Sequence, residues 1–416
     1  MDNRELRGLR IAATKKIRHG KDGWVVPSQT GDGTFYHVSL EEQTCTCPDH
    51  ELRRVKCKHI FAVEYTIRRE TDTNGNVTTT KTVRLTYAQN WTAYNHAQTE
   101  EKTRFTALLA DLCQNVPQPP QTNGRPRLPM SDMVFASAFK VYTMFSARRF
   151  TSDLRDAHTE GLVATTPHFN SVCNYMADPK LTPILKSLVV ASSLPLKAVE
   201  TDFAVDSSGF STCRFVRWFN KKYGRELDNR EWVKVHLMCG VQTHIVTSVD
   251  ISGWEANDTT YFAPLVEETA RHFRIDEVSA DKAYPSHKNM AVVARLGGTP
   301  FIPFKSNTVA PTDDSQWARM YHYFMFNRQN FLEHYHQRSN VESVFSMIKG
   351  KFGDAIRSKE DTAQVNEVLC KVLCHNICVL IQSMHELGIE PLFRADPVGL
   401  DARGGTHVPT VHHALI

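Results

Sequence analysis

Three acidic residues, Asp206, Asp281 and Glu342, occur in sequence settings where a carboxylate could take part in catalysis. Asp206 is predicted to end a strand, Asp281 follows a short apolar strand, and the glutamate lies in a stretch with helical periodicity. Magnesium prefers carboxylate oxygens, and two such ions about 3.5–4 Å apart activate a nucleophilic oxygen and stabilise the leaving oxygen in phosphoryl transfer. If the fold brings them together, these three residues predict a metal site for phosphoryl transfer.

Two other aspartates compete with this assignment. Asp202 lies four residues before Asp206, so both share one face of a strand, but the Ser-Ser-Gly that follows Asp206 favours the latter. Asp250 also ends a predicted strand, and its sequel Ile-Ser-Gly-Trp matches no catalytic pattern. Because a lone aspartate at a strand end is more often a turn or capping residue, the assignment depends on the whole set.

A polar stripe follows one side of the helix predicted over residues 332–352. At roughly 100° per residue its members fall within an arc of about 60°, and they are Tyr335, Arg338, Glu342 and Lys349. An adjacent apolar stripe consists of Val341, Phe345, Ile348 and Phe352. We expect the apolar stripe to seat the helix on a sheet and to aim Glu342 at the two aspartates.

Cysteine and histidine form a separate cluster with the spacing C-x-C-x9-C-x-H, namely Cys45, Cys47, Cys57 and His59. Three thiolates and an imidazole are a structural zinc set that leaves no open coordination position, so the metal should stabilise folding. His50 is a weaker alternative ligand because it falls on the expected loop. The pattern, with a proline after the second cysteine, resembles the SWIM zinc finger. Cys370, Cys374 and Cys378 with His375 could bind metal too, but a buried helix face explains their spacing better.

Composition limits the class of protein. The chain has 416 residues, 41% hydrophobic and 23% charged, which predicts a soluble protein of two or three domains. Ten scattered cysteines indicate reduced thiols. No run approaches the roughly 18–20 apolar residues of a membrane span, so we expect an intracellular protein with no membrane partner. Basic stretches at 4–21 and 125–149 fit phosphate contacts or a solubilising surface.

The first half of the chain is predicted to form a hairpin followed by helices. The hairpin covers 24–26 and 35–38, with a turn at 31–33. A turn or linker is expected at 71–82 and a loop at the proline-rich 116–129. The predicted helical stretches are 60–69, 87–115 and 130–190, the last with breaks at Pro167, Pro179 and Pro183.

The second half predicts three consecutive strands and then alternating helices and strands. The strands lie within 198–212 and 233–252, before Asp281 and at 299–304, and the helices at 259–273, 286–296, 332–352 and 363–387. This order predicts an α/β fold with a ribonuclease H-like mixed-sheet core, preceded by a helical region and a small N-terminal ββα zinc-finger domain. The predicted parts are a zinc-binding domain at 1–70, a helical DNA-binding or linker region at 71–197, a catalytic domain at 198–390 and a mobile tail at 391–416.

The motifs AVDSSG, SADKAY and YHQRSNVESVFSMIKG resemble those of prokaryotic insertion-sequence DDE transposases, over about residues 200–385. The helix reproduces that family's Tyr-x2-Arg-x3-Glu-x6-Lys signature without a gap. The resemblance implies that Asp206, Asp281 and Glu342 hold Mg²⁺ or Mn²⁺. It also implies that Arg338 and Lys349 contact DNA phosphates and that Tyr335 orients a phosphate.

By the same resemblance, the protein would cleave at the terminal inverted repeats of its element and join the 3′ ends to target DNA. Its partners would be double-stranded DNA and a second protomer that makes a homodimer, in the cytoplasm or nucleoid of a prokaryotic host. Two alternatives are a transposase-derived DNA-binding regulator and a stand-alone ribonuclease H-like nuclease. The intact acidic set counts against the first, and the helix signature counts against the second.

Overall fold

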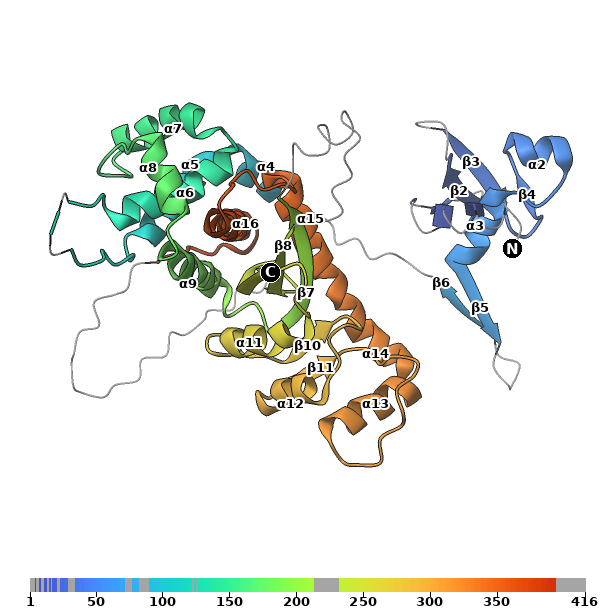
Figure 1. Cartoon of the computed structure of the whole chain (residues 1–416). Coiled ribbons are helices and arrows are strands. Elements are labelled where there is room, and N and C mark those ends of the chain that lie inside the picture. Colours follow the sequence, from blue (N-terminus) through green and yellow to red (C-terminus); the bar gives the residue numbers. More distant parts are fainter. Residues whose placement is uncertain are drawn as a thin grey trace, which may run out of the picture. The chain divides into compact units, whose positions relative to one another are not determined.

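The computed structural model divides the chain into two compact units, Met1–Gln89 and Asn90–Ile416 (Figure 1). The structure describes residues 90–393 apart from 122, 125 and 213–231, and residues 4–81 apart from 5–6, 9–10, 13–14, 16, 21–22, 29–33 and 72–76. The turn expected at 31–33 and nearly all of the expected tail lie outside the described residues. The boundaries expected at 70, 197 and 390 stay predictions.

The described residues of the N-terminal unit include a four-stranded antiparallel sheet, in the order β1-β2-β3-β4, and helices. Its strands are β1 (Arg18–Gly20), β2 (Gly23–Pro27), β3 (Phe35–Ser39) and β4 (Thr44–Cys45), and its helices are α2 (Pro48–Arg53) and α3 (Lys58–Thr66). The predicted hairpin is confirmed, because β2 pairs antiparallel with β3. Alternate apolar residues of the sheet, including Trp24, Val26 and Val38, pack on Ile60 and Val63 of α3.

The helix predicted to reach residue 69 ends earlier. It stops at Thr66, and β5 (Ile67–Thr71) then pairs antiparallel with β6 (Val77–Lys81), inside the segment predicted as a linker. The sequence of β6 is Val-Thr-Thr-Thr-Lys, and β-branched residues favour extended backbone over helix. The linker prediction was therefore wrong for this segment, which forms a two-stranded ribbon.

Six helices precede the sheet of the second unit, as predicted for this region. They are α4 (Trp91–Thr99), α5 (Glu101–Cys113), α6 (Met130–Thr143), α7 (Ala147–Thr159), α8 (Phe169–Met176) and α9 (Leu181–Ser193), with a 3₁₀ turn, η1, at Leu194–Leu196. Pro183 does not interrupt a helix, contrary to the prediction. It lies in the first turn of α9, where a backbone N–H would have no helical partner.

The second unit is built on a five-stranded mixed sheet in the order β11-β10-β7-β8-β9. These strands are β7 (Asp202–Ser211), β8 (Trp232–Gly240), β9 (Val246–Gly253), β10 (Glu277–Ala280) and β11 (Thr299–Phe301). β8 runs antiparallel to both of its neighbours, β7 and β9, whereas β10 and β11 continue the sheet in parallel with β7. The predicted ribonuclease H-like mixed sheet is confirmed.

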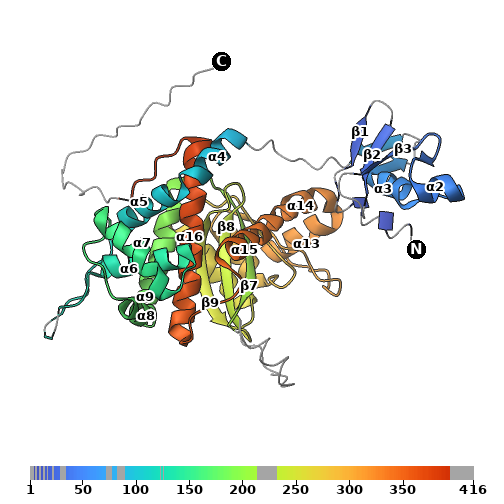
Figure 2. The ribbon, with the colours of Figure 1, turned by 90° about the horizontal axis from the view of Figure 1, so that it is seen from above.

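Helices cover both faces of this sheet. α11 (Thr259–Ala270) and α12 (His287–Arg295) share one core with Phe203 and Val205 of β7. α15 (Ser339–Phe352) and α16 (Asp361–Leu387) share the other core with Ala204 and Phe210. Figure 2 shows α16 between the helices α4–α9 and the sheet. The alternation of side chains along β7 therefore divides the two cores.

The signature helix differs from its prediction. Instead of one helix over 332–352, the chain forms α14 (Arg328–Tyr335), a 3₁₀ turn, η2 (His336–Arg338), and then α15. A 3₁₀ turn has three residues per turn rather than 3.6, so it changes the direction of side chains between α14 and α15. The turn packs against both β7 and β10, which places Arg338 beside the sheet. A further helix, α13 (Gln316–Phe326), was not predicted.

Helix α16 is long and apolar enough to cross a membrane by length and composition alone, contrary to the prediction that no stretch approaches this. However, 78% of its most apolar window is buried inside the fold. It packs against α4, α5, α6 and α9 as well as α15 and the sheet. The predicted packing role of its cysteines is confirmed for Cys370 and Cys374, which are fully buried. His375 lies beside them with Nε2 2.9 Å from the carbonyl oxygen of His244.

The apolar stripe of α15 should account for much of the stability of this unit. Ile348 is fully buried, whereas the neighbouring Met347 is 46% exposed. We expect Ile348→Ala to lower the free energy of unfolding by about 2–5 kcal/mol, because it leaves a cavity between helix and sheet. Met347→Ala should cost less than about 0.5 kcal/mol. Urea unfolding followed by circular dichroism measures both, and equal losses would contradict the seating of α15 by this stripe.

Candidate functional site

Strand pairing brings the two aspartates of the predicted set to neighbouring positions. β10 pairs in parallel with β7 so that Ala280 lies opposite Val205; Asp206 is the next residue of β7, and Asp281 is the first residue after β10. Neighbouring strands lie about 4.8 Å apart. Asp206 does not end its strand as predicted. β7 continues to Ser211 because β8 pairs with it on the other side as far as that residue, so Ser207 and Ser208 stay in the strand.

Arg338 joins Glu342 to this pair of strands. Its Nη1 donates to Oδ2 of Asp206 at 3.0 Å, and its Nη2 donates to Oε1 of Glu342, one helical turn further on. The side chains of Asp206 and Arg338 are 18% and 19% exposed, whereas that of Glu342 is 58% exposed. The guanidinium therefore bridges a shielded carboxylate of the sheet and an accessible carboxylate of the helix.

The electrostatics of Asp206 are those of a crowded acidic site. Burial, together with the negative charges of Asp281 and Glu342, raises the pKa of Asp206 to about 6. The backbone N–H of Ser207 and the guanidinium of Arg338 act in the opposite direction. The charges of Asp281 and Glu342 thus lie close enough to oppose the ionisation of Asp206. This donor set fits hard divalent cations such as Mg²⁺ or Mn²⁺, which bind carboxylate oxygens and offset that repulsion.

Lys349 and Tyr335 lie at the two ends of the predicted stripe. Lys349 donates to the hydroxyl of Ser208 at 2.7 Å, and its ammonium lies 5.2 Å from the ring centre of Phe210. Burial lowers the pKa of Lys349. Ser208 is on the same strand face as Asp206, two residues further on, so Lys349 extends the site along β7. The ring of Tyr335 lies 5.9 Å from the guanidinium of Arg338.

The competing aspartates have other neighbours. Asp202 lies opposite Glu277 at the start of β7, and burial followed by the charge of Glu277 raises the pKa of Asp202. Asp250 forms a 2.6 Å ion pair with Lys186 of α9, which ties the edge strand β9 to the helical layer. Neither is bridged to Glu342 in the structure.

Sequence reasoning missed the residues that hold the loop carrying Asp281. Asn289 of α12 is almost fully buried and donates to the carbonyl oxygens of Tyr284 and Thr259, at 2.9 and 3.3 Å. The hydroxyl of Thr259 donates to the carbonyl oxygen of Ala283 at 2.8 Å, and Asp281 accepts from the N–H of Ala283 at 2.7 Å. Only the capping Ser286 at the start of α12 was a visible signal, because the other bonds join distant parts of the chain.

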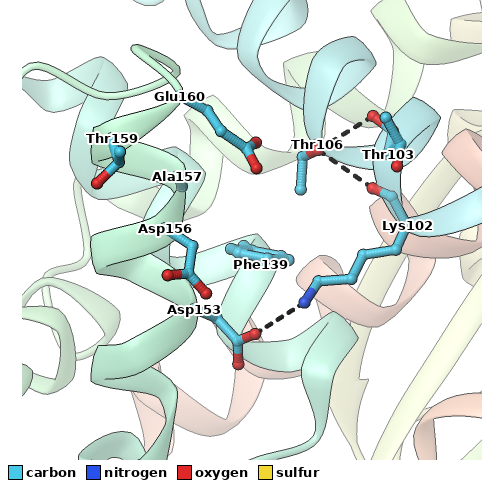
Figure 3. A pocket seen from close by; sticks show the side chains of 9 residues that line it. All are labelled: Lys102, Thr103, Thr106, Phe139, Asp153, Asp156, Ala157, Thr159 and Glu160. Carbon is cyan, nitrogen blue, oxygen red and sulfur yellow. Dashed lines mark hydrogen bonds and ion pairs between the residues drawn. The ribbon is translucent and has the colours of Figure 1, made fainter.

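A separate pocket lies in the helical layer, away from this set (Figure 3). It has a volume of about 360 Å³ and lies among α5, α6 and α7. The ring of Phe139 lines it together with Asp153, Asp156 and Glu160, and Lys102 reaches across to Asp153 at 2.9 Å. None of the candidate catalytic residues contributes to it. Its three acidic side chains outnumber its one lysine, which does not suit a phosphate group.

The predicted zinc ligands come together in the N-terminal unit. Cys45 is in β4, Cys47 precedes α2, Cys57 precedes α3 and His59 is in the first turn of α3. Their ligand atoms lie within 4.8 Å of one another, and all four residues are buried. Nδ1 of His59 is 3.8 Å from the sulfur of Cys45 and 3.9 Å from that of Cys57. These separations fit four ligands around a tetrahedral ion with bonds of about 2.0–2.3 Å.

Two further observations fit a metal at this cluster. A hydrogen bond from the thiol of Cys45 lowers the pKa of Cys57 to about 3, so this sulfur is ready to act as a thiolate ligand. His50, the alternative ligand, is used elsewhere, because its Nδ1 lies 2.8 Å from the carbonyl oxygen of Val55.

Comparison with protein families agrees with both sites. Residues 197–377 match the transposase DDE domain, and residues 36–68 match the SWIM zinc finger. No solved structure matches the chain. The mixed-sheet core and its crowded acidic site fit this match, and the matched domain implies a metal-dependent nuclease or transposase. The chain itself combines a DDE transposase domain with an N-terminal SWIM zinc finger, as its motifs indicated. The domain implies Mg²⁺ or Mn²⁺ and binding to DNA, and the finger implies Zn²⁺.

Loss of one ligand should remove the zinc. We expect Cys57→Ser to abolish stoichiometric zinc binding and to unfold the N-terminal unit, because structural zinc contributes directly to folding. The second unit has its own core and should keep its thermal transition. Metal analysis and limited proteolysis measure both effects, with Cys173→Ser as the control because Cys173 is an exposed cysteine of the second unit. A zinc content unchanged by Cys57→Ser would contradict the ligand assignment.

Proposed function

We propose that this protein is an active transposase that cleaves at the terminal inverted repeats of its element and joins the 3′ ends to target DNA. The observation that carries the proposal is the contact of Arg338 with both Asp206 and Glu342, beside Asp281. The three carboxylates of this site are 60 or more positions apart in the chain, and all three lie in the segment that matches the DDE domain. The rest of the proposal concerns the role of each side chain.

Asp206, Asp281 and Glu342 would hold the divalent cations. When bound, these ions supply Lewis-acid activation of the attacking oxygen and stabilisation of the leaving oxygen. The protein side chains orient the DNA. Lys349 lies beside the metal site along β7, where its ammonium can contact the phosphate next to the scissile bond. The hydroxyl of Tyr335 can donate a hydrogen bond to a phosphate oxygen.

The reaction would proceed in two phosphoryl transfers. In the first, water attacks the phosphorus at the element end, and the bond from phosphorus to the 3′ oxygen breaks. In the second, the freed 3′ hydroxyl attacks a phosphorus of the target strand and displaces the 3′ oxygen there. Each step exchanges one phosphodiester P–O bond for another P–O bond and needs no oxidant or nucleotide cofactor.

DNA ends would be bound outside the catalytic set, by the SWIM finger and by the helical region predicted at 71–197. Arg127, Arg148 and Arg149 of that region are exposed and can contact phosphates. A homodimer would hold two ends together, because each catalytic site acts on one end at a time. We propose that the protein acts in the cytoplasm or nucleoid of a prokaryotic host.

Binding and cleavage should separate in Glu342→Gln. The amide keeps the size of the side chain on an exposed helix face but loses the charge that helps hold the metal. We expect Mg²⁺-dependent cleavage of a labelled terminal repeat to fall by at least about a thousandfold, consistent with the several kcal/mol supplied by metal ions. Gel-shift affinity for the same DNA should change less than about threefold.

Three further variants sharpen this test. Asp206→Asn and Asp281→Asn should behave like Glu342→Gln, whereas Asp202→Asn, on the same face of β7 but beside Glu277, should cleave like the parent. Parental cleavage by Glu342→Gln would reject the acidic set. A parent that binds the repeat but never cuts it would favour the regulator, and cutting without regard to the repeat would favour the stand-alone nuclease.

Lys349 should act on DNA rather than on stability. Its ammonium makes one hydrogen bond, to Ser208, so Lys349→Ala should leave the thermal midpoint nearly unchanged. If it neutralises one phosphate, the slope of log binding constant against log salt concentration should become less steep by about 0.9. Lys351→Ala is the control, because this neighbouring lysine pairs with Glu101 of α5 instead. An unchanged salt slope together with a large loss of stability would indicate a structural lysine.

A further inference from the structure

Arg338 lies where a cation is expected. One guanidinium nitrogen contacts Asp206 and another contacts Glu342, the two carboxylates that would share a metal. Arg338 is four-fifths buried and Asp206 is equally shielded, so the contact forms in a medium of reduced polarity. The single positive charge of the guanidinium therefore offsets part of the repulsion between these two carboxylates, as a bound divalent ion would.

The two cations would compete. An oxygen of Asp206 that accepts an arginine hydrogen bond at 3.0 Å cannot also ligate Mg²⁺ at about 2.1 Å without placing a divalent ion next to the guanidinium. We propose that Arg338 is an internal stand-in for the metal, and that metal binding displaces it from Asp206 and Glu342. This inference rests on the proposed function, since it takes those residues as metal ligands.

The displaced guanidinium has a natural new partner. Arginine presents its N–H groups as a planar fork that matches two oxygens of a phosphate. Arg338 belongs to η2, between two helices, so its backbone can stay in place while the side chain turns from carboxylates to phosphate. Because linkage is reciprocal, DNA that captures the arginine should tighten metal binding, and metal that releases it should tighten DNA binding. The arginine thus couples the two ligands.

Mn²⁺ binding to the full-length, zinc-loaded protein without DNA tests the exchange. Arg338→Ala should bind Mn²⁺ about three- to tenfold more tightly than the parent, because a partly exposed ion pair no longer has to be broken. Lys349→Ala removes a charge from the following helix, α15, at a side chain that bonds to Ser208 rather than to a carboxylate, and should change the affinity less than twofold. Asp206→Asn defines the site, because it should remove this binding. Addition of terminal-repeat DNA should tighten Mn²⁺ binding in the parent but not in Arg338→Ala.

Thermal unfolding gives a second readout that needs no cleavage. Saturating Mn²⁺ should raise the midpoint of Arg338→Ala more than that of the parent. Arg338→Gln, which keeps a donor but no charge, serves if the alanine variant does not fold. Unchanged or weaker Mn²⁺ binding in these variants would overturn the stand-in role while leaving the proposed function intact. Absence of any parental Mn²⁺ binding sensitive to Asp206→Asn would instead reject the metal site and the proposed function with it.

Discussion

The parallel pairing of β10 with β7 is the constraint on which the candidate site depends. It sets Asp281 beside Asp206, and a register shift of one residue would turn one of the two carboxylates to the opposite face of the sheet. The remaining parts follow from this pairing. Asn289 and Thr259 hold the loop after β10, and the buried face of α15 lies on β7 so that Glu342 reaches the same edge.

This arrangement works against local stability. Carboxylates gather where burial already disfavours their charge, and the raised pKa of Asp206 reflects that conflict. The cost is offset elsewhere in the second unit, where two apolar cores lie on either side of the sheet. Arg338 relieves the conflict in part by contributing a positive charge. Within a well-packed domain, an unfavourable local arrangement of this kind is typical of a functional site.

The sequence predicted the parts of the molecule that local spacing encodes. The four zinc ligands and the Arg338–Glu342 turn lie within short segments, and the alternation of strands and helices predicted the mixed sheet. It did not predict β5–β6 or the 3₁₀ turn η2, whose conformation depends on pairing and on contact with the sheet. Nor did it predict that β7 runs on past Asp206, because the partner that extends it, β8, is more than 20 residues away. Asn289 carried no signal, since its bonds reach across the fold.

Helix α16 has a consequence for how the protein is made. The candidate chemical groups all precede residue 350, yet the helix that α4, α5, α6 and α9 pack around is the last described element to be synthesised. A chain that stopped after Phe352 would carry the whole acidic set and the zinc finger, but its helical layer would lack its central partner. On the ribosome, this layer cannot close until Leu387 has left the exit tunnel. The scaffold that aligns the candidate groups is therefore complete only once α16 has been made, and a chain truncated before Asp361 would contain every candidate group without that scaffold.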